Sequence, residues 1–351
     1  MKLKGILVLT LLMVVSIRAS YAQKNIEIDK FDLNFDGRLE YGNTPVNQQD
    51  NKVRQSEYSM QGFIMYADVR LSNNLYGFYR QEFTGYLNRE GGVSTHINML
   101  LIGYDYNHWS FVIGKQPVLN GIYEAFYLPG DVYSYSELSC GFPVWKTGLR
   151  ISHRIGLQEF GVQILNGDLS RVEAKSNTNP LLLNFYWAGD IGKGLIQTRL
   201  NFAGYSKDNF ERYSSKIGLH WNLPHILMDT DFGIDNGLPG FAPQKVRVVA
   251  APIQCIWRHG LIRPGFKYIP NYIDNGTDKK FRFVEANQTG FKQQMLMFLE
   301  LHPWEKDNFH LFALGGWTEY GTIKENHYKA LHQLYEFRVG VKFGLHWPIK
   351  R

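Results

Sequence analysis

Apolar and polar residues alternate through most of this chain. Between Phe31 and Tyr41 the odd positions carry Phe, Leu, Gly or Tyr, while the even positions carry Asp, Asn, Arg or Glu. The segment Tyr335–Leu345 repeats this pattern near the other end of the chain. Because a period of two puts successive side chains on opposite faces of an extended chain, it predicts β-strands with one apolar and one charged face. The strands are about ten residues long, the length of a tilted transmembrane strand.

The stretch DLNFDGRLEYG allows a second interpretation, because its first half resembles a helix-loop-helix calcium site. Such a loop takes Asp32, Asn34 and Asp36 as ligands, turns at Gly37 and ends on a bidentate glutamate. The last position is Asn43, and neither flank has an apolar period of 3.6 residues. The sequence therefore favours a strand here, and we predict no metal site.

The connections between the predicted strands alternate between long polar segments and short turns. Long connections such as LNGDLSRVEAKSNTNP and PNYIDNGTDKKFRFVEANQTG are separated by turns such as SNN, NH and RHG. This alternation is typical of outer-membrane barrels, which have long external loops and short periplasmic turns. We predict an all-β fold, a transmembrane antiparallel up-and-down β-barrel of about sixteen strands. The alternative is a soluble β-sandwich, whose charged faces would point outward.

The first 22 residues predict a secretory signal peptide, which leaves residues 23–351 for the barrel. Lys2 and Lys4 precede an apolar run that is too short to span a bilayer, and Ser20 and Ala22 have the spacing of a cleavage site. Three of the 38 basic residues and none of the 32 acidic ones lie in this segment, so the exported chain has a net charge of only +3. The expected location is the outer membrane of a Gram-negative cell, and nucleic acid is not an expected partner.

Two cysteines, Cys140 and Cys255, are the only ones in the chain. A disulfide between them is chemically allowed in an exported protein, but two unpaired thiols are the simpler expectation. Neither cysteine lies in a Cys-x-x-Cys or Cys/His cluster, so no zinc site or other cofactor is predicted. The aromatic content of 15% fits a barrel with aromatic girdles.

The stretch FVIGKQPVLNGIYEAFYLPGDVYSYSELS carries a resemblance to a known family. Its Gly-Lys-Gln strand end, acidic and aromatic centre and Tyr-Ser pair, followed by Thr147 and Gly148, resemble the phosphate-selective porin O and P family in its Bacteroidetes-type form. This resemblance implies a sixteen-stranded homotrimeric barrel whose third external loop folds into the lumen and narrows it. Outer-membrane lipid and lipopolysaccharide are the surroundings that it implies.

The predicted constriction loop spans residues 117–143, the longest connection. Its candidate site residues are Glu124, Asp131, Tyr133, Tyr135 and Glu137. A loop so rich in Tyr, Phe and Leu is better suited to packing inside a barrel than to free solution, although an external lid is the alternative.

The predicted function is a water-filled channel for passive diffusion of small hydrophilic solutes, with a phosphate-like anion preference. The inner face would attract anions through a set of basic residues, each of which could instead pair with a wall carboxylate. The predicted pore-lining set is Lys115, Arg150, Arg199, Lys216, Arg263, Lys267, Arg338 and Lys342. Inward carboxylates interrupt this set at Asp68, Glu82, Asp229, Asp231 and Glu336.

The alternative function is a barrel enzyme of the phospholipase or protease type. It would need a nucleophile and an oriented base at one rim of the barrel. The histidines are scattered over several strands, and neither Gly-x-Ser-x-Gly nor His-Glu-x-x-His occurs in the sequence. The sequence therefore favours a channel over an enzyme.

Overall fold

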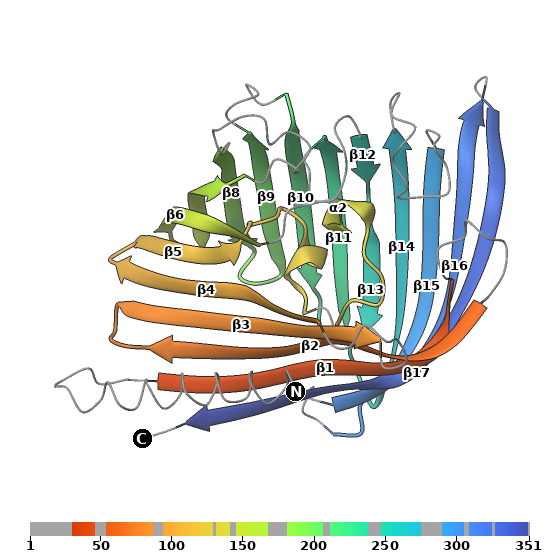
Figure 1. The fold of residues 1–351 in the computed structure, drawn as a ribbon, viewed down its shortest axis with the longest axis horizontal. Helices are drawn as coiled ribbons and strands as arrows, with labels where there is room; N and C mark the ends of the chain where they lie inside the picture. The colour runs from red at the N-terminus through yellow and green to blue at the C-terminus, as the bar shows by residue number, and fades with distance from the viewer. Residues whose placement is uncertain are drawn as a thin grey trace.

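The computed structural model of the protein consists almost entirely of β-strands (Figure 1). It describes residues 30–45, 54–86, 94–128, 131–140, 145–167, 181–205, 211–237, 247–274, 290–304, 309–324 and 327–349. The predicted signal peptide lies outside the described residues, as do parts of the predicted constriction loop, namely 129–130 and 141–143. Among the described residues, no helix is long and apolar enough to cross a membrane.

The first strands are β1 (Lys30–Pro45), β2 (Arg54–Arg70), β3 (Leu75–Tyr86), β4 (Ser94–Tyr106), β5 (Trp109–Pro117), β6 (Trp145–Ile155), β7 (Gln158–Asn166) and β8 (Leu181–Ile191). They are followed by β9 (Ile196–Tyr205), β10 (Tyr213–Asn222), β11 (Ile226–Asn236), β12 (Arg247–Ala250), β13 (Ile253–Trp257), β14 (Ile262–Asp274), β15 (Gly290–Leu301), β16 (Phe309–Lys324) and β17 (His327–Ile349). Between β5 and β6 lie a short 3-10 helix, η1 (Tyr123–Phe126), and a single helical turn, α2 (Glu137–Cys140).

All strands belong to one antiparallel sheet that closes on itself. β1 pairs with β2 on one side and with β17 on the other, so the described sheet has no free edge. β12 and β13 each pair with both β11 and β14, so they form two halves of one strand. The interruption falls at Pro252, which has no N–H for the ladder, although its carbonyl still accepts from the Asp231 N–H at 2.9 Å. The barrel therefore has sixteen strands, as predicted.

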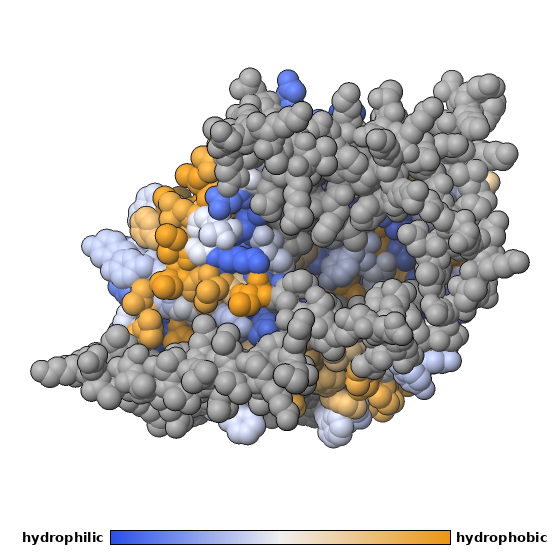
Figure 2. Space-filling view, viewed as in Figure 1, coloured by the Kyte–Doolittle hydropathy of each residue, from blue (hydrophilic) through white to orange (hydrophobic). Residues whose placement is uncertain are grey.

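The two faces of the wall differ as the alternation predicts. On β11, Asp229, Asp231 and Asp235 are buried, whereas Phe232 is 48% exposed. On β4 and β5, Ile102 and Ile113 are among the most exposed apolar residues, and Figure 2 shows apolar side chains gathered at the left, where Figure 1 draws β4 and β5. The polar face therefore points into the barrel and the apolar face points out, which excludes the sandwich with outward charges.

The connections also follow the predicted order. The turns after β2, β4, β6, β8, β10 and β13 are short, and those after β1, β3, β5, β7, β9, β11 and β14 are longer. The last two connections depart from this alternation, because residues 302–308 between β15 and β16 match the length of the connections after β3 and β9, and only residues 325–326 separate β16 from β17. The connection after β5 is the longest and is the third on its side of the barrel.

The candidate calcium loop is the strand β1. Asp32, Asn34 and Arg38 are buried on its inner side, and Leu39 and Tyr41 are exposed on its outer side. No helix flanks this segment within the part of the chain that the structure describes.

Three apolar clusters lie on the inner side of the wall, and each includes a residue from the connection after β5. Val118 packs with Leu165, Leu182, Ala203 and Tyr205; Tyr133 packs with Leu296, Phe298, Phe312 and Leu314; Ile122 and Leu138 pack with Ala250. Two of these clusters use strands whose sequences, PLLLNFYW and MLMFLELH, are apolar on both faces. Inward apolar residues on these strands are therefore explained by the connection that covers them.

Candidate functional site

The connection after β5 is attached to the polar inner face of the wall. η1 contacts β10 and β11, and α2 contacts β11 and β12, as Figure 1 shows near the centre of the view. Backbone groups of such an irregular segment must find hydrogen-bond partners when they are buried. The wall supplies these partners in three groups.

The first group is a row of four fully buried amides, Gln116, Gln163, Asn184 and Asn201, on β5, β7, β8 and β9. Asn201 Oδ1 accepts a hydrogen bond from the Gly121 N–H at 2.8 Å. Asn184 Nδ2 donates to the Leu119 carbonyl at 2.8 Å, and Gln163 Oε1 accepts from the Leu119 N–H at the same distance.

These amides also bond to one another, since Gln163 Nε2 donates to Gln116 Oε1 and Asn201 Nδ2 donates to Asn184 Oδ1. An amide can donate and accept without carrying a charge, so the row satisfies the buried backbone of residues 117–121 at low electrostatic cost.

The second group is a pair of aspartates on β11. Asp231 accepts hydrogen bonds from the N–H groups of Tyr123 at 2.9 Å and Glu124 at 3.2 Å, which hold the start of η1. Asp229 accepts from the Tyr127 hydroxyl at 2.6 Å and lies 2.7 Å from His220 Nδ1. Both carboxylates were expected to interrupt a basic lining, and the structure shows that they bind the connection after β5 instead.

The third group surrounds the buried carboxylate of Glu124. Its oxygens accept from Lys267 Nζ at 2.5 Å, the Ser136 hydroxyl at 2.5 Å and the Ser139 hydroxyl at 2.6 Å. The Ser136 N–H also donates to it at 2.9 Å. Burial alone would raise the pKa of Glu124, but the Lys267 ammonium and the two hydroxyls lower this pKa below its ordinary value. Glu124 therefore joins η1, the segment before α2 and strand β14 as an anion.

Other basic residues of the wall are occupied in the same way. Lys216 Nζ donates to the Leu138 carbonyl at 2.6 Å and pairs with Asp235 at 3.1 Å. Lys292 pairs with Glu137 at 2.6 Å, and Lys342 pairs with Asp131. These pairs neutralise two of the acidic residues that were predicted in the constriction loop.

Tyr133 is held by both its polar and its apolar parts. Its hydroxyl donates to Glu300 at 2.8 Å, and its ring lies 4.7 Å from Phe298 and 5.0 Å from Phe312. Arg338 donates to its carbonyl at 2.6 Å. Tyr135 is half-buried, and burial, followed by the Glu124 carboxylate, raises the pKa of its phenol.

The structure places seven of the eight predicted pore-lining residues on the inner face. Lys216, Lys267, Arg338 and Lys342 bind the connection after β5, and the Arg199 guanidinium lies over the Phe126 ring at 3.6 Å. The other two, Arg150 and Arg263, lie elsewhere on the inner wall; Arg263 stands across from Glu300 in the β14–β15 register.

Lys115 was predicted to line the pore, but its side chain does not lie on the inner face. It has the same parity on β5 as Phe111 and Ile113, which are exposed on the outer face. Its register partners include the exposed residue Leu100, and its ammonium donates to the Ile97 carbonyl at 2.7 Å. Lys115 therefore lies on the outer face of the wall, because the strand alternation decides its side whatever the motif around it.

The amide row and Lys292 were not among the predicted site residues. Uncharged amides on neighbouring strands carry no recognisable motif, although the strand alternation predicts that Gln163 and Asn201 face inward. Among the described residues, no group of three His, Cys, Asp or Glu side chains is placed to hold a metal, and Cys255 has a free thiol.

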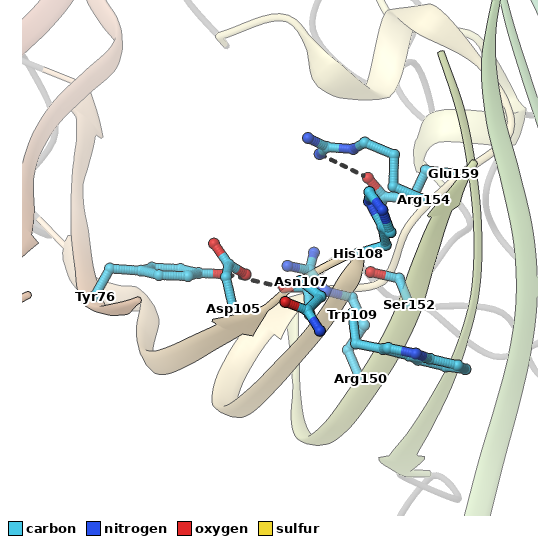
Figure 3. A pocket seen from close by; sticks show the side chains of 10 residues that line it. Tyr76, Asp105, Asn107, His108, Trp109, Arg150, Ser152, Arg154 and Glu159 are labelled. Atoms are coloured by element: carbon cyan, nitrogen blue, oxygen red, sulfur yellow. Dashed lines mark hydrogen bonds and ion pairs between the residues drawn. The ribbon is translucent and has the colours of Figure 1, made fainter. Parts of the chain in front are cut away.

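A cavity of about 270 Å³ remains on the inner wall at the end of the barrel with the short turns. It is lined by residues of β3 to β7, among them Tyr76, Asp105, Arg150, Arg154 and Glu159. Figure 3 shows Tyr76 and Arg154 on opposite sides of this space, with Asp105 between them.

A closed antiparallel barrel with an apolar outside and a polar inside is the architecture of outer-membrane β-barrels, a class that includes the porins. No protein-family model matches the chain, and no curated protein matches it in sequence. Solved structures do match over almost their whole length.

The outer membrane channel DcaP of Acinetobacter baumannii is 13% identical, with a TM-score of 0.62 over 91% of this chain and 96% of that chain. The anion-selective porin from Comamonas acidovorans is 10% identical, with a TM-score of 0.59 over 91% and 99%. OmpT, an outer membrane protein of Vibrio cholerae in its trimer form, is 10% identical, with a TM-score of 0.55 over 91% and 99%. At these identities the likeness establishes the fold, a porin-type sixteen-stranded barrel.

Proposed function

We propose that the protein is an outer-membrane porin, a water-filled channel through which small hydrophilic solutes diffuse passively. The observation that carries this proposal is the closure of the sheet with its polar face inside and its apolar face outside. Within lipid, a β-sheet satisfies its backbone hydrogen bonds only if it closes into a barrel without free edges, and the polar interior of so wide a barrel can hold water. Export by a signal peptide, residues 1–22, to the outer membrane of a Gram-negative cell is part of the proposal.

The connection after β5 contains all but the first residue of the predicted loop 117–143, which is the proposed constriction loop. Its bonds to the inner faces of β1, β7 to β11, β14, β15 and β17 support a position within the lumen rather than an external lid. Glu124 and Glu137 serve to hold it there, and Tyr133 and Tyr135 add bulk to it.

The selectivity that we propose is a modest anion preference at most. The resemblance to phosphate-selective porins and the anion-selective structural neighbour favour anions. However, Lys267, Lys292 and Lys342 are each paired with a carboxylate of the connection, so their fields are largely cancelled. Phosphate selectivity would require a denser set of uncompensated cations.

We also propose a homotrimer surrounded by lipid and lipopolysaccharide. The support is the fold shared with a protein known in a trimer form, together with an apolar outer face that needs either lipid or another copy. Native mass spectrometry of the detergent-extracted protein would give its oligomeric state directly.

The test of the channel is single-channel conductance of the refolded protein in a planar bilayer, with a salt gradient across the membrane. Steady ohmic steps are expected, with a reversal potential near zero or slightly on the anion side. A strong cation preference would contradict the proposed selectivity but not the porin. A folded barrel that does not conduct would contradict the porin, and assays on lipid and peptide substrates would then test the barrel-enzyme alternative.

A further inference from the structure

The cavity at the short-turn end of the barrel is separate from the attachment of the connection after β5. We call it the turn-end cavity, formed by Tyr76 on β3, Asp105 on β4, Ser110 on β5, Arg150 on β6 and Glu159 on β7, with Arg154 at its border. No described residue of the connection after β5 lines this cavity, and the bonds of the connection go to other parts of the wall. Its polar groups therefore face the lumen.

The turn-end cavity contains charges of both signs in equal number. Arg150 and Arg154 contribute two guanidiniums, while Asp105 and Glu159 contribute two carboxylates. Arg154 and Glu159 form an ion pair at 3.3 Å on one side, and Asp105 projects into the cavity between Tyr76 and Arg154 (Figure 3). The carboxylates would repel a simple anion, and the guanidiniums would repel a simple cation. The net charge of the cavity therefore favours neither kind of ion.

Arg150 lines the turn-end cavity with its guanidinium group. Its Nε is buried, and no described residue accepts a hydrogen bond from it. The hydroxyls of Tyr76 and Ser110 are 3.4 Å apart, a long and weak contact that either group could exchange for a ligand atom. The guanidinium group binds carboxylates well because its N–H groups match the two carboxylate oxygens.

We propose that the turn-end cavity is a binding site for small zwitterions, α-amino acids with short side chains. The ligand carboxylate binds at Arg150 and its ammonium group at Asp105, which uses both signs of charge at once. A volume of about 270 Å³ holds a molecule of this size with a few waters. Binding is weak, because a solute in a channel must also leave it. This inference rests on the proposed channel function and names a solute class for it.

The test is the ion current through single channels in the presence of three probes of similar size. L-Alanine is the zwitterion, propionate lacks its ammonium group, and ethylammonium lacks its carboxylate. L-Alanine is expected to reduce the open-channel current and raise its noise in a saturable way. Each of the other two probes is expected to need about tenfold higher concentration for the same effect.

Two substitutions and one control locate the site. Arg150→Gln and Asp105→Asn are each expected to raise the half-saturating L-alanine concentration about tenfold, the weakening that loss of one charged contact produces. Lys115→Gln, on the outer face of the wall, should leave it unchanged. Heat-modifiable migration in gels, which reports a folded barrel, is checked for every variant.

The results distinguish a failure of the binding site from a failure of the channel. Conducting channels on which L-alanine has no saturable effect would overturn the site while leaving the porin intact. Equal effects of propionate and L-alanine, lost only with Arg150→Gln, would overturn the zwitterion in favour of an anion. Folded barrels without any conductance would overturn the porin itself.

Discussion

Many of the described charged residues on the inner wall bond to the connection after β5, among them Lys216, Asp231 and Lys267. Glu124 and Lys267 are both almost fully buried and bond to each other at 2.5 Å. A buried ion pair adds little net stability compared with apolar residues, but it penalises any arrangement that separates its members. The pair therefore ties η1 to Lys267 of β14 while η1 itself lies against β10 and β11, and this position sets the shape of the proposed constriction.

The first prediction concerns a substitution that removes one member of this pair. Lys267→Met should leave the Glu124 carboxylate buried without its cation, which weakens the attachment by about 3–5 kcal/mol. Hydrogen exchange of residues 118–140 should accelerate, and single-channel currents should become noisier. The double variant Lys267→Met with Glu124→Gln should recover part of the protection, because it removes the unpaired charge. Unchanged exchange in the single variant would contradict this role for Lys267.

The second prediction concerns pH. Glu124 lies outside the strands, and its pKa in the folded protein is lower than the ordinary value of 4.5. A carboxyl group with a lowered pKa stabilises the folded arrangement above its unfolded pKa and loses this contribution as pH falls through the lowered value. Channel conductance should therefore stay constant from neutral pH down to the ordinary pKa and change only below it. A transition in conductance at a pH well above that value would show that another group controls the attachment.

The third prediction concerns Lys115. Since its side chain lies on the outer face of β5, Lys115→Met should leave conductance and reversal potential unchanged. The matched substitution Arg150→Met, on the inner face of the neighbouring strand, should shift the reversal potential toward cations because it removes a positive charge from the lumen. A shift of similar size in both variants would contradict the assignment of faces.

At the scale of elements, the connection after β5 depends on close approach of its backbone to the wall. A Cβ on Gly121 would lie 2.1 Å from the Lys216 carbonyl oxygen and 2.7 Å from the Asn201 nitrogen. Only glycine allows the Gly121 N–H to reach Asn201 Oδ1 without moving β9 or β10. The amide row and Gly121 therefore both serve to hold the backbone of the connection against the wall.

The fourth prediction tests this approach. Gly121→Ala should displace the start of η1 at a cost of about 1–3 kcal/mol, the usual penalty for an atom that does not fit. Its readouts are faster hydrogen exchange at residues 118–124 and a changed single-channel conductance. Gly315→Ala is the control, because a Cβ there would meet no atom within 4 Å. If the two variants behave alike, close packing at Gly121 is not what holds the connection.

At the scale of the whole molecule, the barrel is stable in a membrane because its outer face is apolar and its sheet is closed. β1 pairs with β17 over thirteen register positions, from Phe31 with Ile349 to Asn43 with Phe337. Each strand therefore has its backbone hydrogen bonds satisfied by two neighbours, which lipid could not provide.

The fifth prediction tests the outer face. Leu200, on β9, is 39% exposed on the apolar side of the wall. Leu200→Lys should lower the free energy of unfolding by about 2–4 kcal/mol if the position lies near the middle of the bilayer, because the charge must enter hydrocarbon. Leu200→Met should cost far less. Equilibrium denaturation in lipid vesicles measures both, and equal stabilities would contradict contact with lipid at this position.

The alternation of side chains by itself determined the strands, their faces, the sixteen-stranded barrel and the position of the longest connection. A period of two is a local property, so it can be read from residues such as Asp32 and Leu33 without knowledge of their partners. It also indicated that Lys216 and Lys267 face inward. The same alternation places Lys115 outward, where the surrounding motif had led to the opposite expectation.

Only the tertiary structure decided what the inward residues contact. Glu124 and Lys267 are 143 positions apart, and Tyr133 and Glu300 are 167 apart. The side on which a strand residue lies follows from its neighbours in sequence, but the place where a long connection meets the wall depends on packing across the closed barrel. For this reason the sequence could not show that most of the predicted pore-lining residues contact the connection after β5. Nor could it show that Arg150 instead lines a cavity.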